Sequence, residues 1–244
     1  MSRFLFLLCF ALMNSAAQAA PVTLTAADGV KVHGEWWQAA RARAPIILAF
    51  HQAGSSHAEY EPIAKRLNQA GFSVLAIDQR SGGSQFNGTN KTVAALGRST
   101  AYDSALKDLE AALAWGKANA QGAPVIVWGS SYSAALVFLL AARHPDDVSG
   151  LLAFSPGEYL DQPHAVHTAA QKISVPVFID QASDKDEINQ SRLILQEVKS
   201  SDKRQFTPQT GVHGSATLRA DRNPKGAEEN WDAVLAFLAQ FNGR

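Results

Sequence analysis

The sequence predicts an α/β protein in which a mostly parallel sheet carries helices on both faces. From residue 45 onward, short apolar runs rich in β-branched residues alternate with segments whose apolar residues recur at helical spacing. Alternation of strand and helix along one chain is typical of a parallel sheet, because each helix returns the chain to the edge where the strand began. Apolar residues make up 46% of the chain, and no linker or repeat divides it. We therefore expect one domain.

The first nineteen residues are expected to be a secretion signal outside this fold. Arg3 gives a short positive start, residues 4–13 are apolar, and Ala17-Gln18-Ala19 has the small residues that signal peptidase requires. The apolar run is too short to cross a bilayer, which takes about 20 residues. The single cysteine, Cys9, lies inside this run, so the mature chain has no disulfide. We predict a signal peptide over residues 1–19, a domain over 20–244, and export to the periplasm or beyond.

The charge balance excludes a protein that binds nucleic acid through a strong overall field. The chain has 22 Lys and Arg against 22 Asp and Glu, for a formal net charge of zero. No His and carboxylate spacing fits a metal-binding pattern, and no thiolate ligand survives signal cleavage. We therefore expect no cofactor, no metal and no stable membrane insertion, and a small molecule as the partner.

The elements follow from local patterns along the chain. Asp28-Gly29 separates two alternating runs and predicts an antiparallel hairpin at the start of the domain. Residues 85–98 are polar and rich in Gly and Asn, which indicates a long surface excursion. Further strands are expected at 45–50, 72–77, 124–128, 148–154, 175–180 and 204–207, and helices at 59–70, 102–118, 134–143, 187–199 and 226–241.

The turn between the strand at 124–128 and the following helix indicates an activated serine. Only residues 129–133 join the two elements, so the middle residue must take a strained, left-handed conformation with small neighbours on both sides. Ser131 has Gly129 before it and Ser133 after it, at two residues' distance. Ser130 instead has the bulky Trp128 and Tyr132 at those positions. The pattern is Gly-x-Ser-x-Gly with Ser in the last position, and it selects Ser131 as the nucleophile.

A serine hydroxyl needs a base, and the base needs an orienting acid. His213 lies between Gly211 and Gly214, after the last expected strand and before the closing helix, and is the candidate base. The candidate acid is Asp184 in the loop after the strand at 175–180, with Asp186 as the alternative. Asp186 is also a candidate N-cap of the next helix. Glu187 and Glu158 are left as further possibilities.

The oxyanion of an acyl-transfer intermediate needs two backbone donors. The first is expected to be the N–H of Tyr132, which follows the nucleophile at the start of a helix. The second is expected from the loop that follows Phe50, at Gln52 or Ala53, with His51 holding that loop.

These segments, in this order, resemble the α/β-hydrolase family. They are His51-Gln52-Ala53-Gly54, the loop from Asp78 to Ser84, Gly129-Ser130-Ser131-Tyr132-Ser133, the Asp184 loop and Gly211-Val212-His213-Gly214. Over residues 22–242 the chain looks like a small bacterial esterase or a dienelactone-hydrolase-like member. The resemblance implies an eight-stranded sheet with the hairpin at one edge. Two departures are Ser133 in place of the second Gly, and Gln52-Ala53 where the family often has glycines.

The resemblance implies a serine hydrolase that cleaves small carboxylic esters through an acyl-enzyme intermediate. Only 20 residues separate the strands where the family often inserts a lid, so we expect a minimal cap and a small acyl substrate. Candidate pocket walls are Tyr132, Tyr159, His164, His167 and the loop at 85–98. Dienelactone hydrolases use cysteine, so their substrate is not carried over. The alternatives are a peptidase or amidase with the same triad, and a non-catalytic ligand-binding protein of the same fold.

Overall fold

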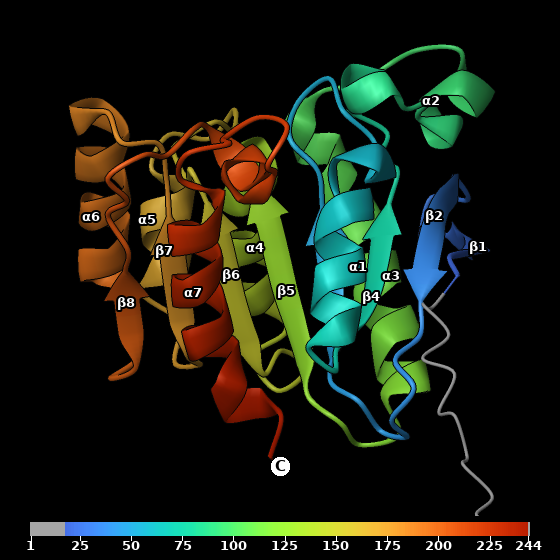
Figure 1. The fold of residues 1–244 in the computed structure, drawn as a ribbon. Coiled ribbons are helices and arrows are strands. Elements are labelled where there is room, and N and C mark those ends of the chain that lie inside the picture. The colour runs from blue at the N-terminus through green and yellow to red at the C-terminus, as the bar shows by residue number, and fades with distance from the viewer. Residues whose placement is uncertain (1–17, 244) are drawn as a thin grey trace, which may run out of the picture.

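Eight strands form one sheet in the order β1-β2-β4-β3-β5-β6-β7-β8 in the computed structural model, which describes residues 18–243 (Figure 1). β1 pairs with β2 and β2 with β4 in antiparallel fashion, and the other neighbours are parallel. The strands are β1 (Ala20–Thr25), β2 (Lys31–Trp37), β3 (Ile46–Phe50), β4 (Ser73–Ile77), β5 (Val125–Ser130), β6 (Gly150–Phe154), β7 (Val177–Asp180) and β8 (Lys203–Gln205). The mostly parallel eight-stranded sheet predicted from the sequence is confirmed.

Seven α-helices and several short 3₁₀ turns connect the strands within the described residues. The helices are α1 (Glu61–Gln69), α2 (Lys91–Leu96), α3 (Leu106–Ala120), α4 (Tyr132–Arg143), α5 (Ala165–Ala170), α6 (Lys185–Glu197) and α7 (Ala227–Leu238). The 3₁₀ turns span His57–Glu59, Gln85–Asn87, Tyr102–Ala105, Gly214–Leu218 and Ala239–Phe241. The helix expected at 102–118 therefore begins with a 3₁₀ turn, and the surface excursion at 85–98 contains the short helix α2.

The opening hairpin forms at one edge of the sheet, as predicted. Gly29 has φ +85° in the turn, a conformation that glycine adopts without steric cost. Leu24 and Val32 are paired and buried, whereas the next pair, Thr25 and Lys31, is exposed. This alternation is why the run folds as a half-buried strand pair. β1 begins at Ala20, directly after the predicted cleavage point, but nearly all of the predicted signal peptide lies outside the described residues.

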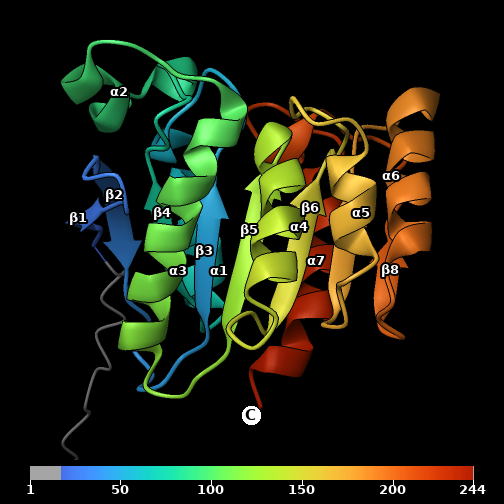
Figure 2. The same cartoon turned by 180° about the vertical axis from the view of Figure 1, so that it is seen from behind.

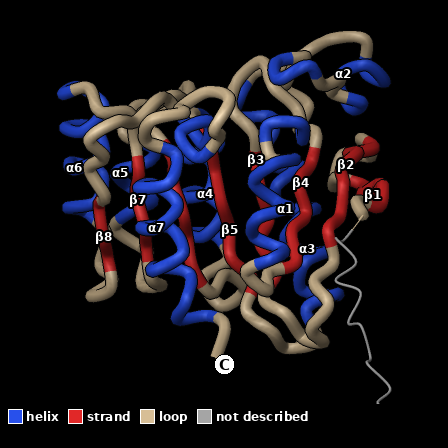
Figure 3. The backbone as a smooth tube through the Cα atoms, viewed as in Figure 1, coloured by secondary structure: helices blue, strands red, loops and turns tan. Residues whose placement is uncertain are grey.

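Helices cover both faces of the sheet and bury a separate apolar core on each. Figures 1 and 3 show α1 and α7 side by side on one face, and Figure 2 shows α3, α4, α5 and α6 on the other. The strand β3 is buried along its whole length, because Ile47 and Ala49 face the first core while Ile46, Leu48 and Phe50 face the second. Its apolar run is therefore continuous rather than alternating.

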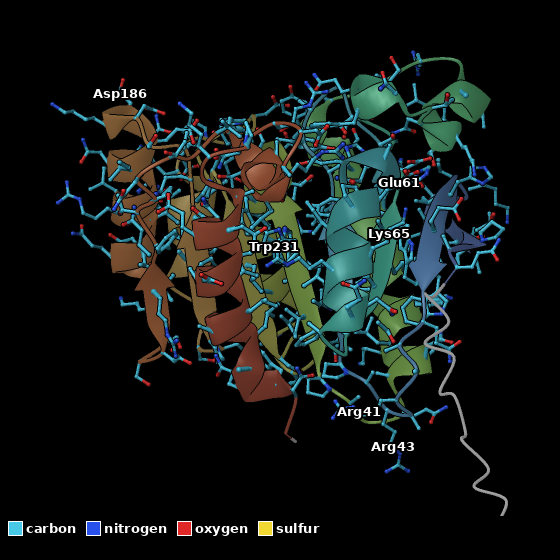
Figure 4. All side chains as sticks on the ribbon, in the orientation of Figure 1. Arg41, Arg43, Glu61, Lys65, Asp186 and Trp231 are labelled. Atoms are coloured by element: carbon cyan, nitrogen blue, oxygen red, sulfur yellow. The ribbon has the colours of Figure 1, made fainter. Side chains whose placement is uncertain are left out.

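The two helices of the first face are joined by one arginine. Arg66 of α1 lies over the ring of Trp231 of α7, 4.6 Å from its centroid, and pairs with Glu228. Figure 4 shows Trp231 at this junction. Between β6 and β7, α5 packs beside α4 and α6 on the second face of the sheet instead of over the strand ends, so the cap is minimal, as predicted (Figure 2).

A buried arginine fixes the loop that follows β4. Arg80 is 5% exposed, and its guanidinium donates to Asp108 of α3 at 2.7 and 2.9 Å and to Asp28 of the hairpin turn at 2.6 and 3.0 Å. Its backbone N–H also donates to Asp108, at 2.8 Å. Asp108 is fully buried, whereas the Asp28 side chain is 29% exposed.

Arg80→Ala is expected to lower the free energy of unfolding by about 3–5 kcal/mol, because it leaves the Asp108 carboxylate buried without a counter-ion. Asp28→Asn is the matched control and should cost less than about 1 kcal/mol, because its side chain remains solvated. Urea unfolding of the two variants at pH 7 measures the difference. Equal losses would mean that Asp108 is not compensated mainly by Arg80.

Candidate active site

The turn between β5 and α4 holds Ser131 in a strained conformation. Ser131 has φ +58° and ψ −122° and is 8% exposed, whereas Ser130 is the last residue of the strand. A side chain at Gly129 would place its Cβ 2.2 Å from the carbonyl oxygen of Ser133. Glycine is therefore required at this position, and the steric reasoning that selected Ser131 over Ser130 agrees with the backbone.

Ser133 occupies the position where the motif usually has glycine, and its hydroxyl makes two hydrogen bonds that glycine could not. Its Oγ donates to the carbonyl of His51 at 2.6 Å and accepts from Gln79 Nε2 at 2.6 Å. Ser133 is fully buried, so both bonds form away from water. They tie the first turn of α4 to the loops that follow β3 and β4.

His213 bridges the serine and a carboxylate. Its Nε2 lies 2.8 Å from Ser131 Oγ, and its Nδ1 lies 2.6 Å from Glu187 Oε1. Since a carboxylate can only accept, Nδ1 carries the proton and Nε2 accepts from the serine hydroxyl. The structure thus brings the predicted Ser131 and His213 together, on loops that follow β5 and β8.

The predicted acid is wrong: Glu187, and not Asp184 or Asp186, contacts His213. Asp184 is the N-cap of α6, and its Oδ1 accepts from the backbone N–H groups of Asp186 and Glu187 at 3.0 and 3.1 Å. Asp186 is exposed at the outer end of α6 (Figure 4). Glu158 instead pairs with His167, 2.6 Å away. Asp184, followed three residues later by Glu187, resembles a capping sequence. This spacing is the signal in the sequence that Asp184 caps the helix and leaves Glu187 as the acid.

The Glu187–His213 contact shifts both groups toward their charged forms. The hydrogen bond that His213 donates to Glu187 raises the pKa of His213 against the opposing effect of burial. Burial alone would raise the pKa of Glu187, but the bond from His213 and a contact with Ser155 outweigh burial and lower it. At neutral pH Glu187 is therefore ionised and favours protonation of His213.

One of the two predicted oxyanion donors needs correcting. Ser131 N–H donates to the carbonyl of Phe154, and within residues 18–243 the N–H of Tyr132 has no acceptor. The N–H of Gln52 donates to Glu59 Oε2 at 2.8 Å, so it is not available to a substrate. The N–H of Ala53, the other candidate in that loop, has no acceptor in the same part of the chain.

His51 holds the loop that carries Ala53. It is fully buried, and burial lowers its pKa to about 4, so the ring is neutral. Nδ1 donates to the carbonyl of Gln52 at 2.8 Å, and Nε2 accepts from the backbone N–H of Gln79 at 3.0 Å. These bonds support the structural role expected for His51.

A cavity of about 520 Å³ opens beside His213. Its walls include Gln52 and the 3₁₀ turn Gln85–Asn87 from the predicted loop, together with Val212 and Arg222. The expected wall residues Tyr159 and His167 line a different cavity, of about 280 Å³, that also contains Glu158. Neither cavity is lined by Tyr132, which is 1% exposed, or by His164.

Residues 18–243 contain no cluster of His, Cys, Asp and Glu that could hold a metal ion. In the same stretch no helix is both long enough and apolar enough to span a bilayer.

Comparison with known proteins agrees with the resemblance drawn from the sequence. The family model described as serine aminopeptidase, S33, matches residues 41–169. An esterase from Pyrococcus furiosus superposes with a TM-score of 0.71 at 20% identity, over 93% of this chain and 94% of that one. A dienelactone hydrolase from Anabaena variabilis gives 0.71 at 18% identity, over 93% and 99%. A cold-adapted esterase from an Arctic intertidal metagenomic library gives 0.69 at 18% identity, over 94% and 96%.

No curated protein matches the sequence. At these identities the superpositions establish the fold, and the predicted α/β-hydrolase architecture is confirmed.

Glu187→Gln is expected to lower the pKa of His213, because it removes the charged hydrogen-bond partner, which is the largest effect that opposes burial. Titration of the His213 ring protons by NMR measures the shift. Asp184→Asn is the matched control: Asn also caps helices, and Asp184 acts on His213 only through its more distant charge. A larger shift for Asp184→Asn than for Glu187→Gln would contradict the assignment of the acid.

Proposed function

Because the chain belongs to the serine aminopeptidase S33 family of α/β-hydrolases, we propose that it hydrolyses small carboxylic esters through a serine acyl-enzyme. The observation that carries this proposal is the hydrogen-bonded series Ser131–His213–Glu187, with contacts of 2.8 and 2.6 Å. Ser131 would be the nucleophile, His213 the general base and acid, and Glu187 the residue that orients the imidazole and stabilises its charged form.

In the acylation step, Ser131 Oγ attacks the ester carbonyl carbon while His213 Nε2 takes the hydroxyl proton. The carbonyl oxygen becomes an oxyanion, and its donors are the N–H groups of Tyr132 and Ala53, which have no acceptor within residues 18–243. The C–O bond to the alcohol then breaks as His213 returns its proton to the leaving oxygen. A water molecule, deprotonated by His213, then attacks the acyl carbon. The bond to Ser131 Oγ breaks as His213 returns the proton to that oxygen, which releases the acid and restores Ser131.

The carboxylates near Ser131 favour an ester over the N-terminus of a peptide. An aminopeptidase must hold the α-ammonium of its substrate, for which a carboxylate is the usual partner. Of the carboxylates near the serine, Glu187 is bonded to His213 and Glu59 is fully buried. An ester substrate therefore fits this site better than the substrate of an aminopeptidase.

The cavity also indicates the kind of alcohol that the site prefers. His213 must protonate the leaving oxygen, so a cavity that His213 lines receives the alcohol part of the substrate. Arg222 makes no side-chain hydrogen bond within residues 18–243, and Asp221, 3.6 Å away, already accepts two bonds from Arg219. The ring of Phe86 lies against both guanidinium groups, 4.6 and 5.0 Å from its centroid. We propose that a negatively charged alcohol part is preferred.

Export of the mature chain remains part of the proposal. It is supported by the charged start, the apolar run and the small residues of positions 1–19, and by the start of β1 at Ala20.

A fluorophosphonate probe is expected to label the purified protein, and Ser131→Ala should abolish the labelling while Ser130→Ala should not. Absence of labelling, or labelling that survives Ser131→Ala, would support the non-catalytic alternative. p-Nitrophenyl esters and aminoacyl anilides with the same acyl groups then separate the two hydrolytic activities. Faster cleavage of the anilides would favour the peptidase.

Arg222→Gln is expected to raise KM for 4-acetoxybenzoate about fivefold, the effect of losing a half-exposed charge interaction of about 1 kcal/mol. The neutral 4-acetoxybenzamide, which has nearly the same shape, should be unaffected. Arg192→Gln, on exposed α6, is the control for a general change in surface charge. Equal changes for both substrates would contradict a charge-based preference.

A further inference from the structure

A second carboxylate, besides Glu187, contacts Ser130, the residue before the nucleophile. The proposed reaction does not use it. Glu59, at the end of the 3₁₀ turn His57–Glu59, is fully buried. Its Oε1 accepts from Ser130 Oγ at 2.7 Å, and its Oε2 accepts from Gln52 N–H at 2.8 Å. Within residues 18–243 no Lys, Arg or His lies within 4 Å of its oxygens.

A carboxylate in this position is unfavourable for folding. Burial raises the pKa of Glu59 to about 7, although the bonds from Ser130 and Gln52 offset part of the effect. A buried charge without an adjacent cation destabilises a protein relative to a neutral side chain of the same shape. The reason for a carboxylate at Glu59 therefore has to lie in the segments to which its two hydrogen bonds connect.

Its first bond sets the direction of the oxyanion loop, which we define as residues 51–55. Because the Gln52 N–H points to Glu59, the next N–H along the loop, that of Ala53, is left without an acceptor in the described chain. An N–H that serves a substrate must be held in place before the substrate arrives, since reorientation during the reaction would cost rate. The carboxylate of Glu59 holds the oxyanion loop in place by accepting the hydrogen bond from Gln52 N–H.

Its second bond reaches the histidine loop, which we define as residues 211–215. The Ser130 hydroxyl donates its hydrogen bond to Glu59, so its Oγ is free to accept, and it accepts from the N–H of Ser215 at 2.8 Å. Ser215 is two residues after His213. Its Oγ accepts from Trp128 Nε1 at 2.9 Å and lies 3.2 Å from the hydroxyl of Tyr60. Above its pKa of about 7 the Glu59 carboxylate is ionised and can only accept, so it fixes the direction of the whole series.

The charge of Glu59 also acts on His213. The carboxylates that raise the pKa of His213 are Glu187, by direct contact, then Glu59 and Asp184 through their charges. Arg219, whose side chain donates to the backbone carbonyl of Glu59, is the cation whose charge acts on Glu59 itself. A negative charge at Glu59 therefore favours the imidazolium that forms when Ser131 is deprotonated.

We infer that Glu59 is a positioning residue: one buried carboxylate orients the oxyanion loop, Ser130 beside the nucleophile and the histidine loop together. This inference rests on the proposed serine-hydrolase reaction. Neutralising Glu59 should therefore affect the rate and the pH profile more than substrate binding.

The test compares Glu59→Gln with Ser130→Ala. Glu59→Gln should lower kcat about 10- to 100-fold on an acetyl ester with KM nearly unchanged, as expected for loss of oxyanion preorganisation. The acid limb of kcat/KM should move to lower pH, and the NMR-measured pKa of His213 should fall. Ser130→Ala keeps the charge but breaks the series, so it should lower kcat without moving the pKa of His213.

Asp180→Asn is the control for loss of a buried carboxylate. Asp180 is also fully buried, but its side chain bonds to the backbone of Gln181 and not to any of the three segments. It should leave the pKa of His213 unchanged. A Glu59→Gln protein with wild-type kcat, or with an unchanged pKa of His213, would overturn the inference.

Two further results keep the test decisive. Fluorophosphonate labelling of the wild type reports on the proposed function alone, and the NMR titration of His213 reports on Glu59 even in the absence of turnover. If Glu59→Gln does not fold, Ser130→Ala decides: a reduced kcat at constant KM supports the inference, and a wild-type kcat rejects it.

Discussion

The strained turn at Ser131 is the constraint on which the rest of the site depends. A strand that becomes a helix within one residue forces φ +58° at that residue and leaves no space for a side chain at Gly129. Such a conformation costs roughly 1–3 kcal/mol and persists only where the surroundings determine it. Here β5 lies in the middle of the sheet between β3 and β6, and α4 is buried along most of its length. The sheet thus holds the turn, and the turn presents the hydroxyl at the carboxyl edge of the strands.

The loops around this turn are fixed mainly by bonds to one another. Ser133 joins the nucleophile turn to His51, and Glu59 joins the oxyanion loop to Ser130 and through it to Ser215. Loops at the edge of a sheet are otherwise the most mobile parts of a fold. Buried polar bonds between loops make their relative positions cooperative, so that a change in one loop is transmitted to the others.

Most of the fold and part of the site follow from local sequence. The hairpin is encoded by Asp28-Gly29 between alternating runs, and Ser131 by the size of the residues on either side. The acid could not be chosen in this way, because Asp184 and Glu187 differ only in whether the side chain turns back to its own helix or across to His213. The sequence could not show either that the Gln52 N–H is unavailable to a substrate, because this depends on its bond to the buried Glu59, seven residues later.

The position of Glu187 in the first turn of α6 has a consequence for the response of the protein to heat. Helix ends open locally at free energies well below that of global unfolding. This turn is held by the exposed cap Asp184, whereas β5 and α4 are buried. In the proposed mechanism, warming would therefore detach the acid from His213 while the core is still intact. The upper working temperature would then be set by a few residues at the surface, and it could be raised by stiffening that turn alone.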